Sequence, residues 1–156
     1  MMLCWIVRRP SGGGLSASSY APEDLAHEIG RSVPGFHAGE IHRVLRFLHS
    51  RPDISKVKAV VTTDHLGPAA LHALVTFPDR SIGLAVVASV SSYASIVQAE
   101  DYATPSSIDI TGVLGYYDLP DLSASLAPRP QLILCPVDPM LQPLTQSVAI
   151  TEYAMA

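Results

Sequence analysis

The sequence has few cysteines, no excess of basic residues and no long apolar run, and each scarcity excludes a class of protein. The 156-residue chain has 2 cysteines, Cys4 and Cys135, too few for a disulfide framework. Both lie in apolar runs, where free and buried thiols are expected. Scattered basic residues, 10 Lys and Arg against 14 Asp and Glu with a net charge of −4, exclude a nucleic-acid partner.

The longest apolar runs fall short of the roughly 20 residues that cross a bilayer, so no membrane partner is expected. Residues 3–7 form too short a run for the apolar part of a signal peptide, and the arginines follow this run instead of preceding it. The default prediction is therefore a soluble cytoplasmic chain.

The apolar residues that are present, 48% of the chain with a mean hydropathy of +0.28, suffice for one buried core. Short apolar or β-branched runs predict strands at residues 3–7, 57–62, 83–90 and 131–135. The run at 83–90 is continuous, which is typical of a strand covered on both faces. Helical spacing predicts helices at residues 36–50, after Gly67-Pro68, and from about Leu141.

Two stretches, residues 11–36 and 91–125, show no sustained period and predict long loops, with a short helical excursion as an alternative for the second. Alternating strands and helices predict an α/β fold with a mainly parallel sheet of about four strands flanked by helices. The chain would form a single domain over residues 1–156, and its exposed sheet edges would allow a homo-oligomer.

Ligands of parallel α/β sheets bind at the carboxyl ends of the strands. Residues 62–67, TTDHLG, stand between a predicted strand and a helix, where a nucleophile elbow would lie. Asp138 stands directly after the strand that ends at Cys135. These two places hold the candidate site residues.

The order of these stretches resembles the second half of an α/β-hydrolase, and more narrowly is similar to the acetyl xylan esterase-like branch. The stretches are residues 39–48, 48–54, 60–75, 84–89, 116–122 and 126–138. The resemblance covers about residues 2–148 and starts where the family is already several strands into its sheet, so the family's early strands and last strand are expected to be missing. It implies an esterase with an elbow nucleophile, an acid, a histidine after the last strand and an oxyanion hole of two backbone N–H groups.

The family's elbow has the pattern G-x-S-x-G, often with another glycine after it. If Gly67 is that following glycine, the nucleophile position falls on Asp64; if Gly67 is the second glycine of the pattern, it falls on His65. Asp64 is favoured because the helix then begins at the usual point. The serine is absent, as are both glycines, replaced by Thr62 and Leu66. A carboxylate can itself attack carbon, and dehalogenases and epoxide hydrolases are similar in using an elbow Asp.

Both candidate carboxylates also have a structural interpretation. Asp64 would cap the following helix by accepting a hydrogen bond from a backbone N–H. Asp138, the family's acid position, would otherwise begin a turn with the proline that follows it. The catalytic histidine has no counterpart, because all six histidines precede Asp138. His65 is next to Asp64, but neighbours in sequence rarely face each other.

Weaker signals complete the prediction. Ser92 and Tyr93 match the family's pocket-lining position and would bind substrate; other tyrosines that would suit a sugar-facing wall are Tyr102, Tyr116 and Tyr117. Asp118 and Asp121 are expected to cap a helix, not to bind a metal. Residues 11–14, SGGG, match no phosphate-binding pattern. No cofactor or metal is expected.

Two hypotheses follow. In the first, the protein is a hydrolase that acts on a small ester or a carbohydrate ester through Asp64 or His65 and Asp138. In the second, it is a degenerate or truncated hydrolase domain that serves as a binding or assembly module, or is a truncated gene product. The ancestry favours an esterase, and the missing serine and histidine favour impaired catalysis.

Overall fold

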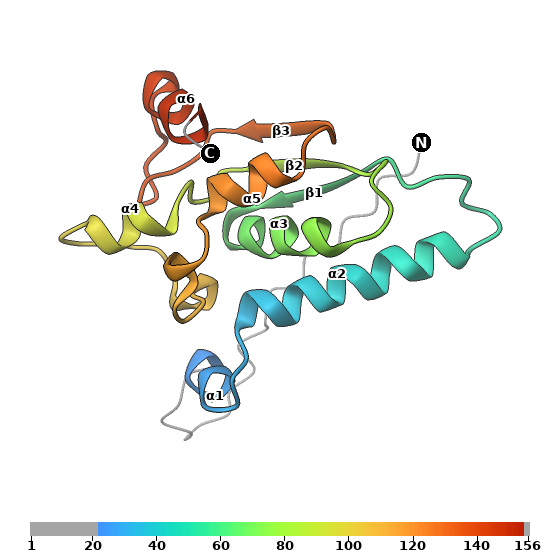
Figure 1. Ribbon diagram of the computed structural model, residues 1–156, viewed down its shortest axis with the longest axis horizontal. Helices are drawn as coiled ribbons and strands as arrows, with labels where there is room; N and C mark the ends of the chain where they lie inside the picture. Colours follow the sequence, from blue (N-terminus) through green and yellow to red (C-terminus); the bar gives the residue numbers. More distant parts are fainter. Residues whose placement is uncertain (1–21, 155–156) are drawn as a thin grey trace.

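A computed structural model describes residues 22–154 of the chain (Figure 1). The predicted strand at residues 3–7, together with Cys4 and the SGGG stretch, lies outside the described residues. Three strands form one parallel sheet in the order β1-β2-β3: β1 (Ala59–Thr63), β2 (Gly83–Val87) and β3 (Gln131–Leu134). The α/β class and the three strands predicted in this part of the chain are confirmed, with ends that differ by one to three residues.

Three helices pack on one face of the sheet. Helix α3 (Gly67–Thr76) contacts β1 and β2, and both α2 (Val33–Ser50) and α5 (Leu119–Ser125) pack against α3 (Figure 1). Side chains of the sheet that face these helices, such as Leu84 and Val86, are buried with Leu74 of α3. The predicted helices at 36–50 and after Gly67-Pro68 are therefore confirmed.

The opposite face of the sheet is largely uncovered within the described residues. Side chains alternate between the faces of a strand, and Val61, Leu132 and Leu134 on this face are 47%, 52% and 43% exposed. The prediction of a sheet covered on both faces thus fails for residues 22–154.

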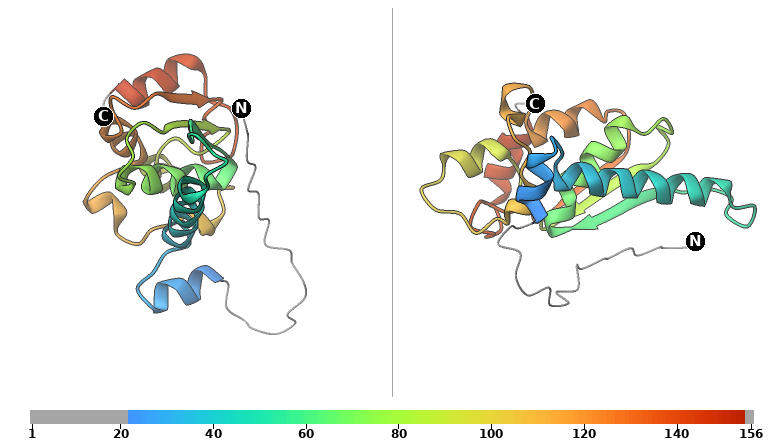
Figure 2. Two further views of the ribbon diagram at one scale, coloured as in Figure 1. Left: turned by 90° about the vertical axis from the view of Figure 1, so that its right-hand side faces the viewer. Right: turned by 90° about the horizontal axis from the view of Figure 1, so that it is seen from below.

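The two stretches predicted as loops contain short helices. The first includes α1 (Pro22–Glu28) and the start of α2, which Ser32 caps by accepting a hydrogen bond from the Gly35 N–H at 3.2 Å. The second contains α4 (Tyr93–Gln98), the 3₁₀ turns η2 (Ser106–Ile108) and η3 (Val113–Gly115), and α5. Helix α6 (Gln146–Ala154) follows β3 and begins later than the predicted Leu141. Figure 2 shows α1 at the far end of α2 from the connection to β1.

Helix α3 approaches strand β2 so closely that only glycine fits at its first position. A Cβ on Gly67 would lie 2.6 Å from the Cβ of Ser89 and 2.9 Å from Cγ1 of Val86. Both contacts are far shorter than carbon atoms tolerate, so any side chain would push the helix away from the sheet.

We expect Gly67→Ala to lower the free energy of unfolding by about 1–3 kcal/mol because of this overpacking. Gly39→Ala is the matched control. Gly39 lies in α2 with open space around its Cα, and the same change there should raise the stability by about 0.5–1 kcal/mol. Urea unfolding of both variants measures the difference, and equal effects would contradict the close approach.

His72 connects α3 to the segment that precedes α5. Its Nδ1–H donates to the Pro68 carbonyl at 2.6 Å, which leaves Nε2 to accept from the Tyr117 hydroxyl at 2.9 Å. Burial lowers the pKa of His72, and the hydrogen bond to Pro68 partly offsets this. The folded protein therefore favours a neutral imidazole.

As the pH falls below about 6.5, the unfolded chain binds a proton at His72 before the folded chain does. The free energy of unfolding should therefore decrease between pH 7 and pH 5. His72→Gln removes this titration, so the variant should show a shallower pH dependence in denaturant titrations at each pH. Parallel curves for the two proteins would disprove the assignment.

Candidate functional site

The three parallel strands each end in a residue with a left-handed backbone. Asp64, Ala88 and Cys135 follow β1, β2 and β3 and have φ of 52°, 53° and 48°. The register that pairs the last residues of the strands places these three residues side by side. Left-handed conformations cost a residue with a Cβ about 1–2 kcal/mol. At this row of three residues the chain turns sharply out of the sheet, which leaves space beyond the ends of the strands.

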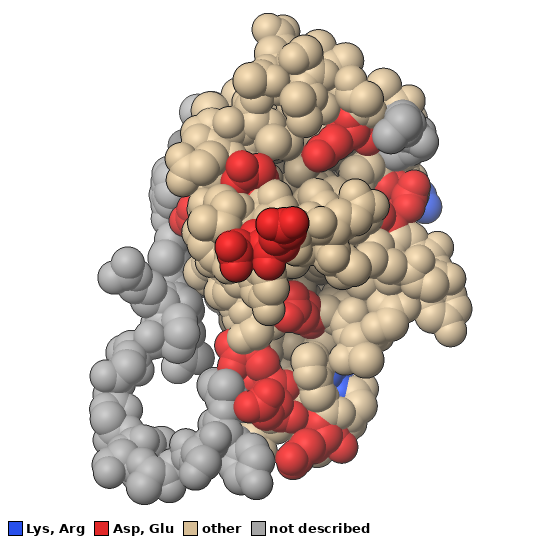
Figure 3. Space-filling view, turned by 90° about the vertical axis from the view of Figure 1, so that its left-hand side faces the viewer, with Lys and Arg blue, Asp and Glu red and all other residues tan. Residues whose placement is uncertain are grey.

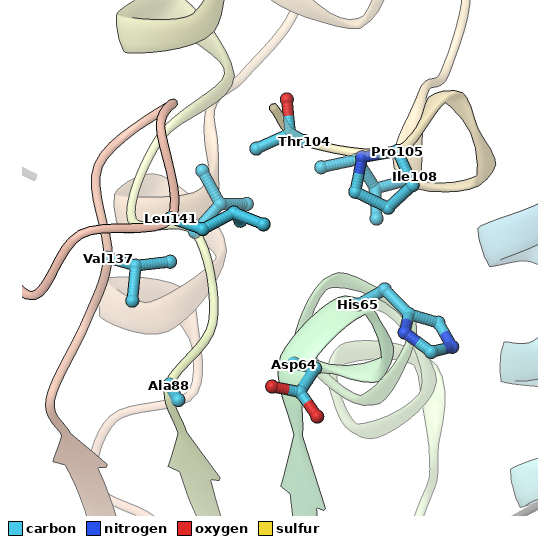
Figure 4. Close-up of a pocket in the computed structure, with 9 residues that line it drawn as sticks. Asp64, His65, Ala88, Thr104, Pro105, Ile108, Val137 and Leu141 are labelled. Carbon is cyan, nitrogen blue, oxygen red and sulfur yellow. The ribbon is translucent and has the colours of Figure 1, made fainter. Parts of the chain in front are cut away.

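A cavity of about 270 Å³ occupies this place (Figure 4). Its walls come from four segments that lie at the carboxyl ends of the strands or above them. The lining residues are Asp64, His65, Ala88, Val90, Thr104, Pro105, Ile108, Val137 and Leu141. Most are apolar, so the cavity combines a hydrophobic wall with a single carboxylate.

Asp64 and His65 point in different directions. In Figure 4 the Asp64 carboxylate extends on the side of Ala88, whereas the His65 imidazole is turned away from it. Both side chains are exposed. The two residues therefore do not form a dyad, in agreement with the expectation that neighbours in sequence rarely face each other.

Asp64 does not cap the following helix. Thr63 is the N-cap of the 3₁₀ turn η1 (Asp64–Leu66) and Leu66 that of α3, and neither cap has a side-chain hydrogen bond. The capping interpretation of Asp64 is wrong, and its carboxylate is available to the cavity.

Thr62, which the resemblance would place at a glycine position of the elbow, has a visible cost. Thr62 is buried, and its hydroxyl has no hydrogen-bond partner, an expensive arrangement in an apolar environment. Gly67, by contrast, provides the close approach of helix to strand described above. The junction between β1 and α3 is thus closely packed at Gly67, has an unpaired buried hydroxyl at Thr62 and has a left-handed backbone at Asp64.

Asp138 lies in a turn that follows β3. Its Oδ1 accepts a hydrogen bond from the Gln142 N–H at 2.8 Å, and its backbone carbonyl accepts from the Leu141 N–H at 2.9 Å. The cavity is lined by Val137 and Leu141 on either side of it. Asp138 therefore helps to hold the rim of the cavity in place.

Four of the histidines in the described part of the chain have partners away from the two candidate carboxylates. His37 pairs with Glu40, and His49 lies 3.5 Å from Asp79. His42 bonds the Ala73 carbonyl at 2.7 Å, and His72 bonds Tyr117. Within residues 22–154, no hydrogen bond of a histidine reaches Asp64 or Asp138.

Ser92 and Tyr93 lie outside the cavity lining and are buried. The Ser92 hydroxyl donates to Asp118 at 2.6 Å and accepts from the Ser95 N–H as the cap of α4. The Tyr93 hydroxyl donates to the Ile108 carbonyl at 3.0 Å. Burial raises the pKa of Tyr93, so this phenol remains a neutral donor. Both side chains hold the segments above the sheet together.

Asp118 caps two helices at once. Its carboxylate accepts from the backbone N–H groups of Tyr93 and Ala94 at the start of α4 and of Leu119 at the start of α5. Asp121 accepts from the Asp118 N–H at 2.7 Å and completes a capping box. The capping prediction for these two carboxylates is confirmed. Of the tyrosines proposed for a sugar-facing wall, Tyr102 and Tyr116 are exposed, and the cavity lining includes neither of them.

The molecule is strongly acidic on the side of the cavity. Figure 3 shows the face at the carboxyl ends of the strands, with Asp and Glu side chains spread over it and Lys and Arg only near its margin. From Ser81 to the end of the chain the single basic residue is Arg129, against Glu100, Asp101, Asp109, Asp118, Asp121, Asp138 and Glu152. Arg129 is buried at the opposite end, where it donates to the Phe77 carbonyl at 2.8 Å.

Cys135 is exposed at the end of β3, so the expectation of a buried thiol is wrong for this residue. The helices of the described part include none that is long and apolar enough to cross a membrane. Among residues 22–154, no three His, Cys, Asp or Glu side chains are grouped so as to hold a metal ion.

Several lining residues were not singled out from the sequence. Ala88, Thr104, Ile108 and Leu141 carry no catalytic group, so no chemical motif marks them. Two signals pointed to their neighbourhood. Ala88 and Leu141 follow strands directly or by a short turn, and Thr104 and Ile108 belong to the stretch without a helical or strand period.

Comparisons with family models, with curated proteins and with solved structures find no match for this chain.

Proposed function

We propose that this chain is an α/β-hydrolase-like domain related to acetyl xylan-type esterases, with impaired catalysis, which binds a small ligand in the cavity at the carboxyl ends of its strands. The observation that carries the proposal is the placement of Asp64. It stands at the elbow position with a left-handed backbone, and its carboxylate has no capping role and borders the cavity.

The impairment is inferred from the missing proton-transfer group. Ester hydrolysis through a serine-type elbow needs a base within hydrogen-bond reach of the nucleophile and an acid that orients the base. Asp64 takes the place of the serine, Asp138 is engaged in its own turn, His42 and His72 bond to other partners, and the His65 imidazole is turned away from Asp64 (Figure 4). Nothing in the described residues links the two carboxylates through an imidazole.

The binding role is supported by the cavity itself. An apolar lining with a few polar groups at its rim is the usual character of a small-molecule site, and the carboxyl ends of parallel strands are the usual location. A volume of about 270 Å³ suits a ligand with a handful of heavy atoms.

One observation favours a second function, ester hydrolysis with Asp64 as the nucleophile. A free carboxylate at a strained elbow is also how a nucleophilic Asp would be presented. In this reading the Asp64 carboxylate attacks the carbonyl carbon of an ester, the C–O bond to the alkoxide breaks, and the alkoxide takes a proton from water to leave as the alcohol. The hydroxide so formed then cleaves the acyl-enzyme anhydride, which releases the carboxylic acid and restores the Asp64 carboxylate. Asp138 would act as the acid position of the family.

Hydrolysis of p-nitrophenyl acetate and butyrate separates the two functions. For the impaired domain, the purified protein should release nitrophenolate no faster than an equal concentration of Asp53→Asn, Asp64→Asn or Asp138→Asn. Asp53 is the matched control because it is exposed and lies before β1, paired with Arg51. A rate at least about tenfold above that of Asp64→Asn, and unchanged in Asp53→Asn, would establish the nucleophilic Asp and overturn the impaired assignment.

A further inference from the structure

The charge around the cavity restricts the kind of ligand that it can hold. Three carboxylates lie in its wall or next to lining residues. Asp64 lines it, Asp138 stands between the lining residues Val137 and Leu141, and Asp109 follows Ile108. A cleft with apolar walls and charge of one sign concentrates the electric field and attracts the opposite charge.

Within residues 22–154, the positive groups near the cavity do not balance these carboxylates. The basic residues that precede Ser81 lie mostly in α2 and in the segments that enter the strands, and Arg129 is buried at the other end of α3. His65 lines the cavity, but its imidazole is turned away from Asp64 (Figure 4). His27 interacts with Asp109 from α1.

Carboxylates are spread over the face at the carboxyl ends of the strands, with Lys and Arg only near its margin (Figure 3). Burial is the first cause that raises the pKa of Asp109; the charge of His27 comes next and lowers it, and the charge of Glu23 raises it. The raised pKa of Asp109 therefore reflects burial and not a negative potential.

We propose that the cavity selects small organic cations, such as amines or quaternary ammonium groups with short alkyl substituents, over neutral and anionic molecules of the same shape. The alkyl groups contact the wall formed by Ala88, Val90, Ile108, Val137 and Leu141, and the positive charge faces the Asp64 carboxylate. This inference rests on the proposed role of the cavity as a ligand site. It assigns Asp64 as the counter-ion of the ligand.

The weak hydration of a quaternary ammonium group agrees with this assignment. A trimethylammonium group is weakly hydrated because methyl groups cover its charge, so the apolar wall can hold it without the cost of desolvating a compact ammonium ion. A phosphate or carboxylate would instead meet the repulsion of Asp64 and Asp138, and no lysine or arginine of the described residues lines the cavity to pair with it.

Three probes of nearly equal shape test the charge preference. Choline is cationic, 3,3-dimethylbutan-1-ol is its neutral isostere, and 3,3-dimethylbutanoate is a related anion. Each is titrated into the full chain at low ionic strength, and backbone amide shifts are followed in ¹⁵N-labelled protein. Choline should shift the amides of Ala88, Val137 and Leu141 with an affinity roughly tenfold higher than that of the alcohol. The anion should bind more weakly than either.

Two variants with the same net charge locate the effect. Asp64→Asn should remove most of the choline preference and leave the alcohol affinity within about twofold, whereas Asp53→Asn should leave both affinities unchanged. Added salt should weaken choline binding to the wild type more than to Asp64→Asn.

Equal affinities for choline and the alcohol would overturn the charge selection while leaving the cavity as a ligand site. Binding of none of the three probes would overturn the ligand site as well. An equal loss of choline binding in the Asp53→Asn and Asp64→Asn variants would show a diffuse charge effect and contradict the role of Asp64. None of these results depends on whether the protein hydrolyses esters.

Discussion

The close approach of helix α3 to strand β2 at Gly67 determines the geometry of the whole carboxyl edge of the sheet. Because no side chain separates the helix from Ser89 and Val86, the chain must turn from β1 into the helix within the three residues of η1. That short connection places Asp64 in a left-handed conformation at the end of the strand. The buried packing of α3 in the core thus supports a strained residue at the surface, and a site of this kind persists only where the surrounding structure fixes it.

Under the proposed function, the same edge would keep a binding cavity in a domain without a catalytic base. The apolar cavity depends on the row of strand ends and on the segments between β2 and α5, which Asp118 holds by capping two helices. Neither feature needs a histidine or a serine. In the proposed hydrolase-like domain, substitution of the nucleophile and loss of the base would remove proton transfer without removing the concave surface, and would leave a carboxylate facing an apolar wall. Such a surface has the chemistry of a site for a cation.

The sequence predicted the elements that depend on residues close together in the chain. Short apolar or β-branched runs predicted β1, β2 and β3, and the spacing of Ile41, Leu45 and Leu48 predicted α2 because one helical face packs on the core. Helix α1, α4 and α5 were missed or left open. They are short, so they leave little periodic signal. The capping box of Asp118 and Asp121 at α5 is local and was predicted, whereas the bond from the Tyr93 N–H at the start of α4 to Asp118 spans 25 residues, and no local pattern reveals it.

The candidate site was likewise predicted from the order of strands and helices, and it was missed where distant side chains bond to each other. Strand-to-helix order identified Asp64 and the region of Asp138, since the carboxyl ends of parallel strands meet at one edge. It offered the turn that the structure has at Asp138 as the alternative to the acid position, but it did not predict that Ser92 would bond to Asp118 or that Cys135 would be exposed. These outcomes depend on side-chain partners chosen in three dimensions and on which face of the sheet the helices cover.

The central claim is that Asp64 is held in a left-handed backbone that presents its carboxylate to the cavity, and the stabilities of Asp64→Gly and Asp64→Ala test it most directly. Glycine adopts this conformation without the Cβ penalty, so Asp64→Gly should be more stable to urea than Asp64→Ala by about 1 kcal/mol. If Asp64→Ala proves the more stable of the two, the backbone at Asp64 is not left-handed, and the account of the elbow and of the cavity built on it is wrong.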